Sequence, residues 1–272
     1  MNELIRNLRS ARLLVAAGAT LIALSTGTSS WAGDGGRKHE TWSWQGAAPA
    51  AGKLAIHGVN GQIIAEPATG NRIEITADKH GRKQDPSTVE IKVVQDSDGI
   101  TVCAIYPHGG SPCSGRGSMH EGARNNDVQV DFTVRVPAGL TFDANTVNGA
   151  VRAIGLNGPV RAHTVNGECE IETSQSGEAS TVNGGVRATL GKVGARDKLD
   201  FNTVNGSITL LLPDGIDARL DGSTVNGSIQ SDFPAKVSGK WGPRSMHATL
   251  GDGGARVNAS TVNGSIRVRR SQ

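Results

Sequence analysis

Apolar and polar residues alternate with a period of two along most of the chain beyond residue 53. The alternation is most regular from Val128 to Val136, where every second residue is apolar until Pro137. This pattern is typical of β-strands that bury one face. Further strands are predicted at 53–57, 62–65, 72–77, 88–94 and 99–105, and no segment outside the N-terminal 32 residues has a helical period. The sequence therefore predicts an all-β protein.

A fixed phrase, Thr-Val-Asn-Gly, recurs six times between residues 146 and 264, and a related Val-Asn-Gly starts at Val59. Its Asn residues are Asn60, Asn148, Asn166, Asn183, Asn205, Asn226 and Asn263. From Asn148 onward they are 18, 17, 22, 21 and 37 residues apart. Near-constant spacing predicts stacked repeats. Because the last step is close to two ordinary ones, we expect a turn without the signature at 232–257.

Each repeat of about 18–22 residues holds two strands and two turns. Since equivalent positions carry the same residue type, as in stacked repeats, we interpret the chain as a β-solenoid, a β-helix-like stack with Thr-Val-Asn-Gly bends. The alternative is a β-meander, because Asn-Gly often forms hairpin turns. In the solenoid, an inward Asn at every bend would form a hydrogen-bonded ladder.

The Val of the signature has two possible orientations. If Thr and Asn point inward, an exposed apolar ribbon is expected, formed by Val147, Val165, Val182, Val204 and Val225. Exposed apolar ribbons often mark a partner surface. The alternative, which we favour, is that the bend shifts the phase of alternation and buries these Val residues.

The N-terminus is typical of a signal peptide. Arg6, Arg9 and Arg12 precede the apolar run Leu13–Leu24, and Ser30-Trp31-Ala32 suits signal-peptidase cleavage after Ala32. We expect an exported protein, periplasmic or at the cell surface, with no membrane span after cleavage. The expected organisation is a signal peptide at 1–32, a flexible segment at 33–52, a β-rich module at 53–106, a polar loop at 107–127 and the repeat solenoid at 128–272.

Composition and charge limit the classes of molecule that the protein is expected to bind. The leader holds three Arg and one Glu, which leaves about +1 of the chain's net charge of +3 after cleavage. Without a basic stripe interleaved with aromatic residues, nucleic acid is not an expected partner. With 37 Gly and only four Trp, four Phe and one Tyr, the chain favours a narrow aliphatic core.

Few residues suggest catalysis. Glu170 and Glu172 form the one close outward pair of carboxylates, which a solvated strand face explains. No nucleophile-elbow motif stands between a strand and a helix, and Gly251–Gly254 lacks the Lys of a phosphate loop. We therefore predict no catalytic residue and no cofactor, and keep a polysaccharide-active enzyme as the alternative.

The cysteines divide into two groups. Cys103, His108, Cys113 and His120 could surround zinc, but in an exported protein Cys103 and Cys113 are expected to form a disulfide. Free thiols are the third possibility, and no metal site is predicted. Cys169 occupies a position that other repeats fill with Val or Ile, so it is expected to be a buried core residue.

Two segments carry a resemblance to a known family. The run VDFTVRVPAGLTFDANTVNGAVRAIGLNGPVRAHTVNG, followed later by SDFPAKV and GDGGARVNASTVNGSIRVRR, resembles the DUF4097 family of bacterial adhesin-like proteins. The resemblance runs from about His39 to the end. It implies an exported β-repeat protein of the cell envelope, associated with adhesion or envelope stress, and it transfers no catalytic residue. The partners it suggests are an envelope polysaccharide or a cell-surface protein, and a structural or stress-related role is the other alternative.

Overall fold

The computed structural model describes residues 38–49, 52–107, 113, 126–239 and 242–271. The predicted signal peptide and most of the predicted 107–127 loop lie outside these residues. The described chain is all-β, apart from one 3-10 turn at Pro86–Thr88. None of its helices is long and apolar enough to cross a membrane.

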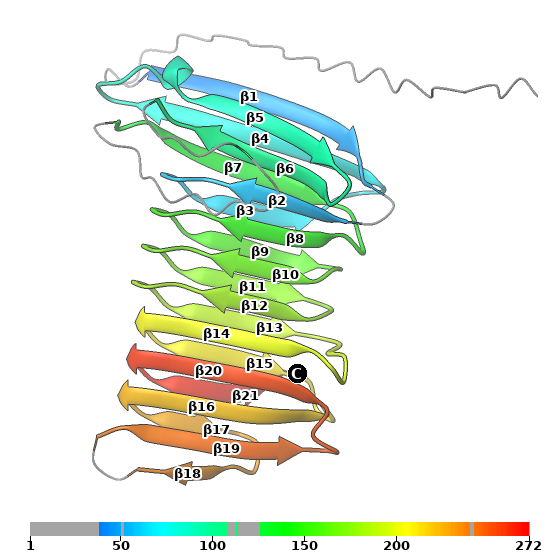
Figure 1. Cartoon of the computed structure of the whole chain (residues 1–272), viewed down its shortest axis with the longest axis vertical. Coiled ribbons are helices and arrows are strands. Elements are labelled where there is room, and N and C mark those ends of the chain that lie inside the picture. The colour runs from blue at the N-terminus through cyan, green and yellow to red at the C-terminus, as the bar shows by residue number, and fades with distance from the viewer. Residues whose placement is uncertain (1–37, 50–51, 108–112, 114–125, 240–241, 272) are drawn as a thin grey trace, which may run out of the picture.

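The strands form two large mixed sheets, one of ten and one of eleven described strands, which face each other along the long axis of the molecule (Figure 1). Sheet A contains, in spatial order, β1 (Lys38–Ala47), β4 (Arg72–Gly81), β7 (Gln129–Val136), β3 (Ile63–Pro67), β9 (Val151–Leu156), β11 (Cys169–Thr173), β13 (Val186–Leu190), β15 (Ile208–Leu212), β21 (Ile266–Arg270) and β17 (Ile229–Ser231). Sheet B contains β18 (Lys236–Ser238), β19 (Arg244–Leu250), β16 (Ala218–Asn226), β20 (Ala255–Asn263), β14 (Lys198–Asn205), β12 (Gly177–Ser180), β10 (Val160–His163), β8 (Thr141–Asn145), β2 (Lys53–His57), β6 (Gly99–Ile105) and β5 (Glu90–Asp96).

Consecutive strands of the repeat region alternate between the two sheets. Strand β8 lies in sheet B, the signature bend follows it, and β9 lies in sheet A. Each strand then pairs in parallel with the equivalent strand of the next repeat, so that Val160 opposes Phe142 and Cys169 opposes Val151. The Asn-Gly bends therefore connect sheets and do not close hairpins, which excludes the β-meander.

The core is a narrow layer between the sheets. It is lined by Val, Ile, Leu and Ala from alternate positions of both sheets, with Phe132, Phe142 and Phe201 as its largest buried side chains. The period-two pattern of the sequence accounts for this arrangement, because each strand turns its apolar face toward the other sheet. Antiparallel strands lie at both ends of the stack, β1 and β5 at one end and β18 and β19 at the other (Figure 1).

The order of strands in space departs from their order in the chain, and it corrects the prediction of an unsigned turn. Strands β20 and β21 lie between the pair β14 and β15 and the pair β16 and β17. The long step from Asn226 to Asn263 contains β17 and then the antiparallel strands β18 and β19, after which β20 lies between β14 and β16. Asn263 consequently lies between Asn205 and Asn226, and no signature is missing there.

Candidate functional site

The signature Thr residues anchor the bends from inside. All six are buried, and the hydroxyl of each donates to the carbonyl oxygen of the Gly in the neighbouring bend. Thr181 Oγ1, for example, lies 2.9 Å from the Gly167 oxygen and Thr203 Oγ1 lies 2.8 Å from the Gly184 oxygen. Because a buried unpaired carbonyl is costly, these bonds stabilise the contact between neighbouring repeats.

The signature Gly is required by close packing. A Cβ atom added to Gly184 would overlap the carbonyl group of Gly167, and one added to Gly206 would overlap that of Gly184. The same overlap occurs at every Gly of the six signatures. The backbone of each bend thus lies directly on the next, which only a residue without a side chain allows.

The Asn side chains form a ladder along the edge of the stack. In the spatial order Asn60, Asn148, Asn166, Asn183, Asn205, Asn263, Asn226, the Nδ2 of every Asn after Asn60 donates to the Oδ1 of the Asn before it, at 2.8 or 2.9 Å. The predicted inward orientation is wrong: the six Asn of the full signatures are exposed, and Asn60 is half-buried. The bend turns the chain at the edge of the molecule, so Thr takes the last inward position and Asn lies in solvent.

The signature Val residues point outward, and the predicted burial of these side chains is wrong. Five have exposed fractions between 38% and 43%: Val165, Val182, Val204, Val225 and Val262. We call these five the valine row. Val147 is only partly buried, and Val59, at the N-terminal end of the ladder, is buried. Side chains continue to alternate between inward and outward through the Thr and Val of the signature, because β14, β16 and β20 extend to the Asn of their signatures.

A second row of uncharged polar residues runs beside the valine row. It consists of the residues that precede the signature Thr in five of the six signatures, from the second signature along the chain onward, namely His163, Ser180, Asn202, Ser260 and Ser223 in spatial order. We call these five the polar row. Two pairs of neighbours within it are bonded: His163 Nδ1 lies 2.6 Å from Ser180 Oγ, and Ser223 Oγ donates to Ser260 Oγ at 3.2 Å. Sequence reasoning missed this row, although a polar residue before every signature Thr was visible.

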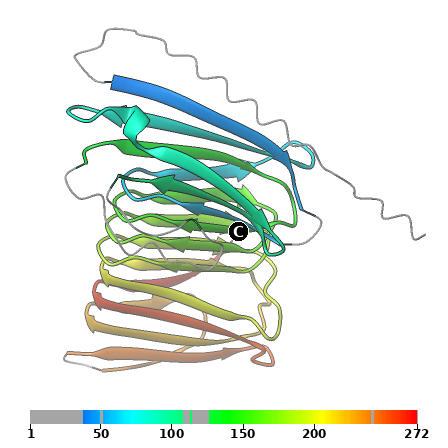
Figure 2. The same ribbon diagram turned by 45° about the horizontal axis from the view of Figure 1, so that its top comes forward.

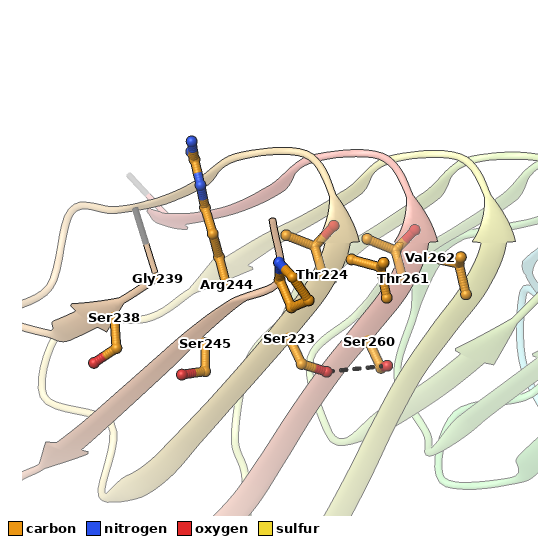
Figure 3. Close-up of a pocket in the computed structure, with 11 residues that line it drawn as sticks. Ser223, Thr224, Ser238, Gly239, Arg244, Ser245, Ser260, Thr261 and Val262 are labelled. Atoms are coloured by element: carbon orange, nitrogen blue, oxygen red, sulfur yellow. Dashed lines mark hydrogen bonds between the residues drawn. The ribbon is translucent and has the colours of Figure 1, made fainter. Parts of the chain in front are cut away.

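The two rows end in a groove at the β18 end of the stack. It has a volume of about 340 Å³ and is lined by Val225 and Val262, by the serines of the neighbouring strands, and by Gly239 and Pro243. Ser245 and Ser238 continue the polar row across β19 and β18. Figure 3 shows the Arg244 side chain pointing away from these serine hydroxyls, so the groove presents hydroxyl and methyl groups.

The carboxylates considered for catalysis lie elsewhere. Glu170 lies on the outer face of sheet A, 3.1 Å from the guanidinium of Arg152 and 3.9 Å from that of Arg187. Its carboxylate is engaged in ion pairs across neighbouring strands, and Glu172 is exposed one position along the same face. The structure does not bring Glu170 or Glu172 to the valine row or to the groove.

The cysteines fall into the predicted groups. Cys103 and Cys113 form a disulfide, with 5.8 Å between their Cα atoms. Cys169 is free and buried, and burial raises the pKa of its thiol to about 12. His108 and His120, the other residues of the zinc alternative, lie outside the described residues. Among described residues, no group of three or more His, Cys, Asp or Glu is arranged to hold a metal ion.

One buried histidine was not anticipated. His57, next to Cys103 across the sheet, is 6% exposed, and neither of its ring nitrogens has a hydrogen-bond partner. Burial lowers the pKa of its imidazole below the usual 6.5, and the nearby Asp143 opposes this shift. A lone His in a strand gives no such signal in the sequence.

Comparisons with known proteins give distant structural likenesses. No protein-family model and no curated protein sequence matches the chain. A "putative cell adhesion protein" from Clostridium sporogenes is 11% identical over 86% of this chain and 100% of its own length, with a TM-score of 0.46. A "putative adhesin" from Bacteroides fragilis is 10% identical over 84% of this chain and 96% of its own, with a TM-score of 0.31.

Proposed function

We propose that this chain is a non-enzymatic, exported, adhesin-like protein whose two-sheeted β-solenoid presents its signature edge as a binding surface in the cell envelope. The observation that carries the proposal is the valine row. Five exposed Val side chains line one edge of a stack whose other exposed positions are mainly polar or charged. Contiguous exposed apolar surface of this kind marks interaction sites more often than isolated residues do.

The Asn ladder and the bend backbone beside the valine row are suited to binding a ligand. Within the ladder, each interior Asn uses one amide hydrogen and one lone pair for its neighbours, which leaves one donor and one acceptor for solvent or a ligand. The bend backbone is bonded to the next bend, as in the bond from the Asn183 amide to the Val165 oxygen. A surface held in this way loses little conformational entropy when it binds.

The proposal extends to family, organisation and location. We propose that the chain belongs to the DUF4097 family and is exported after cleavage at Ala32. We also propose that it is divided into a module at 53–106 and a solenoid at 128–272. The Cys103–Cys113 disulfide is consistent with an oxidising compartment. The expected partners are an envelope polysaccharide or a cell-surface protein.

The test is binding of the purified protein to isolated envelope fractions, with Val165→Lys as the variant. Because Val165 is 38% exposed, the variant is expected to keep its melting temperature while it loses binding. Fractionation with protease shaving checks the location. Release of sugar products that disappears in Glu170→Gln or Glu172→Gln would instead establish the enzyme alternative, and a protein that binds no envelope fraction would leave the structural role.

A further inference from the structure

We infer that the signature edge binds an extended, uncharged polysaccharide that runs along the stack, across the strands, with one end in the groove beside Ser223 and Ser260. This inference rests on the proposed function and deepens it by giving the class of ligand. It is carried by the chemistry of the valine row, the polar row and the side chains that flank them.

The two rows repeat with the strands. Neighbouring strands of a sheet are about 4.8 Å apart, and residues two apart on a strand are about 6.7 Å apart. At each of five successive strands or bends, a ligand that runs along the stack meets one Val methyl pair, one hydroxyl, amide or imidazole group and one Asn amide. A surface with a translational repeat matches a ligand with a translational repeat, since every unit finds the same contacts.

The chemistry of the rows fits sugar rings. Hydroxyl and amide groups both donate and accept hydrogen bonds, as sugar hydroxyls do. The Val methyls offer an apolar surface for the C–H faces of the rings. Protein interfaces, by contrast, are enriched in aromatic residues, Met and Arg at their centres, and neither row contains any of these.

The charges near the rows oppose an acidic polymer. Neither row carries a carboxylate, ammonium or guanidinium group. The next outward positions on the same strands include Glu178, Asp200 and Asp221, which oppose Arg161, Asn258 and His247 across the sheet. Three carboxylates lie beside the two rows, one of them paired with Arg161. Arg244, the cation among the residues that line the groove, points away from the serine hydroxyls (Figure 3). An uncharged ligand is therefore the complementary one.

The groove gives this surface a defined end. Ser223, Ser245 and Ser260 line it together with Val225, Val262 and Pro243, and Figure 3 shows the three serine side chains pointing the same way. Its volume of about 340 Å³ is at the lower end of the range of small-ligand pockets. A terminal sugar ring placed there would meet hydroxyls and methyls together.

The experiment measures retention of the whole exported protein on an immobilised neutral β-glucan, mannan and galactan, with alginate as the acidic comparison. At least one neutral polymer should bind, and its affinity should change less than about two-fold between low and high salt because no ion pairs are involved. The double variant Val182→Lys with Val204→Lys should weaken binding by about ten-fold or more. Ser180→Ala with Asn202→Ala should weaken it by a smaller factor.

The matched control is Gln230→Lys, which adds a charge at an exposed position on the outer face of sheet A and should bind as the parent does. All variants should keep the parent's melting temperature. Binding only to alginate, with strong salt dependence, would overturn the ligand class and leave the proposed function standing. Self-association that the valine variants abolish, without binding to any polymer, would assign the edge to a second copy. Binding to no polymer and to no envelope fraction would refute both proposals.

Discussion

At the scale of single residues, the signature combines four different environments. Thr is buried and bonded, Val is exposed, Asn bonds its neighbours in solvent, and Gly packs against the next bend. The position of Gly is the most restricted, because the obstacle to a side chain there is backbone and cannot move aside. Substitutions at these positions should therefore have graded costs.

Gly184→Ala should destabilise the protein by about 1–3 kcal/mol, since its Cβ would overlap the Gly167 carbonyl. The adjacent Gly185→Ala is the control: its Cβ would have Ser207 O at 3.5 Å as its nearest neighbour, an ordinary contact, and should change stability by less than about 0.5 kcal/mol. Urea unfolding measures both. Equal midpoints for the two variants would show that the bends can separate without cost.

Thr203→Val should cost about 1–3 kcal/mol, because it leaves the Gly184 carbonyl without its buried donor. Asn205→Ala removes two exposed side-chain hydrogen bonds and should cost about 0.5–1.5 kcal/mol, since water replaces them in part. Asn157→Ala, at the opposite bend, should cost least. Thermal or chemical unfolding of the three variants gives the order, and a larger loss for Asn205→Ala than for Thr203→Val would contradict these burial assignments.

His57 makes stability depend on pH. Its pKa is lowered in the fold by burial, so below about pH 6.5 the unfolded chain takes up a proton that the folded protein resists. Stability should fall as pH drops below that value, and His57→Gln should make the fall shallower. The control is His247→Gln, which changes an exposed imidazole that lies 2.6 Å from Asp221. Unfolding curves between pH 5 and 8 measure the slopes, and parallel slopes for parent and His57→Gln would exclude the effect.

At the scale of elements, the important feature is the insertion of β20 and β21 between earlier strands. Parallel pairing requires only that equivalent strands lie side by side. After the antiparallel strands β18 and β19, the chain therefore can return and place β20 between β14 and β16, which both precede it in the sequence. Figure 2 shows this return, with the strands near the C-terminus between those of earlier repeats. Position in the chain therefore does not give position in the stack.

Two isoleucines in equivalent repeat positions test this topology. Ile266 on β21 is fully buried between β15 and β17, whereas Ile229 on β17 is at the edge of sheet A and 8% exposed. Ile266→Ala should cost about 5 kcal/mol, and Ile229→Ala about 2 kcal/mol. Chain order alone would place Ile266 in the terminal repeat and reverse these costs, so equilibrium unfolding of the two variants decides between the arrangements.

At the scale of the whole molecule, each repeat contacts mainly its two neighbours, as Figure 1 shows. Stability in such a stack is approximately a sum of repeat terms and interface terms. Strands flanked on both sides should open less often than strands at an end.

Amide hydrogen exchange should therefore be slowest in β10 to β13, in the middle of the stack, and fastest in β18 and β5 at the edges of sheet B. The β6 to β7 region provides an internal comparison, because the Cys103–Cys113 disulfide lies there and should slow exchange near Cys103 until the bond is reduced. Mass spectrometry of fragments measures the gradient. Uniform exchange along the chain would mean that the stack opens as one unit.

The local structure of this protein follows from its amino-acid sequence alone. The period of two predicted strands at 53–57 and 99–105 that match β2 and β6, the recurring signature predicted stacked repeats, and the spacing and expected export predicted the Cys103–Cys113 pair. These properties depend on residues close in the chain or on a recurring motif, and the sequence shows both directly.

The direction in which the bend residues face and the place of the last repeat in the stack depend instead on contacts between distant segments. The orientation of Val204 and Asn205 depends on how far β14 continues before the chain turns, which neighbouring strands set through their hydrogen bonds. The place of β20 is defined by its parallel pairing with β14 on one side and β16 on the other, and the repeat sequences are too similar to specify these partners. Burial of His57 likewise arises from packing between segments far apart in sequence, because desolvation depends on surroundings that no local pattern records.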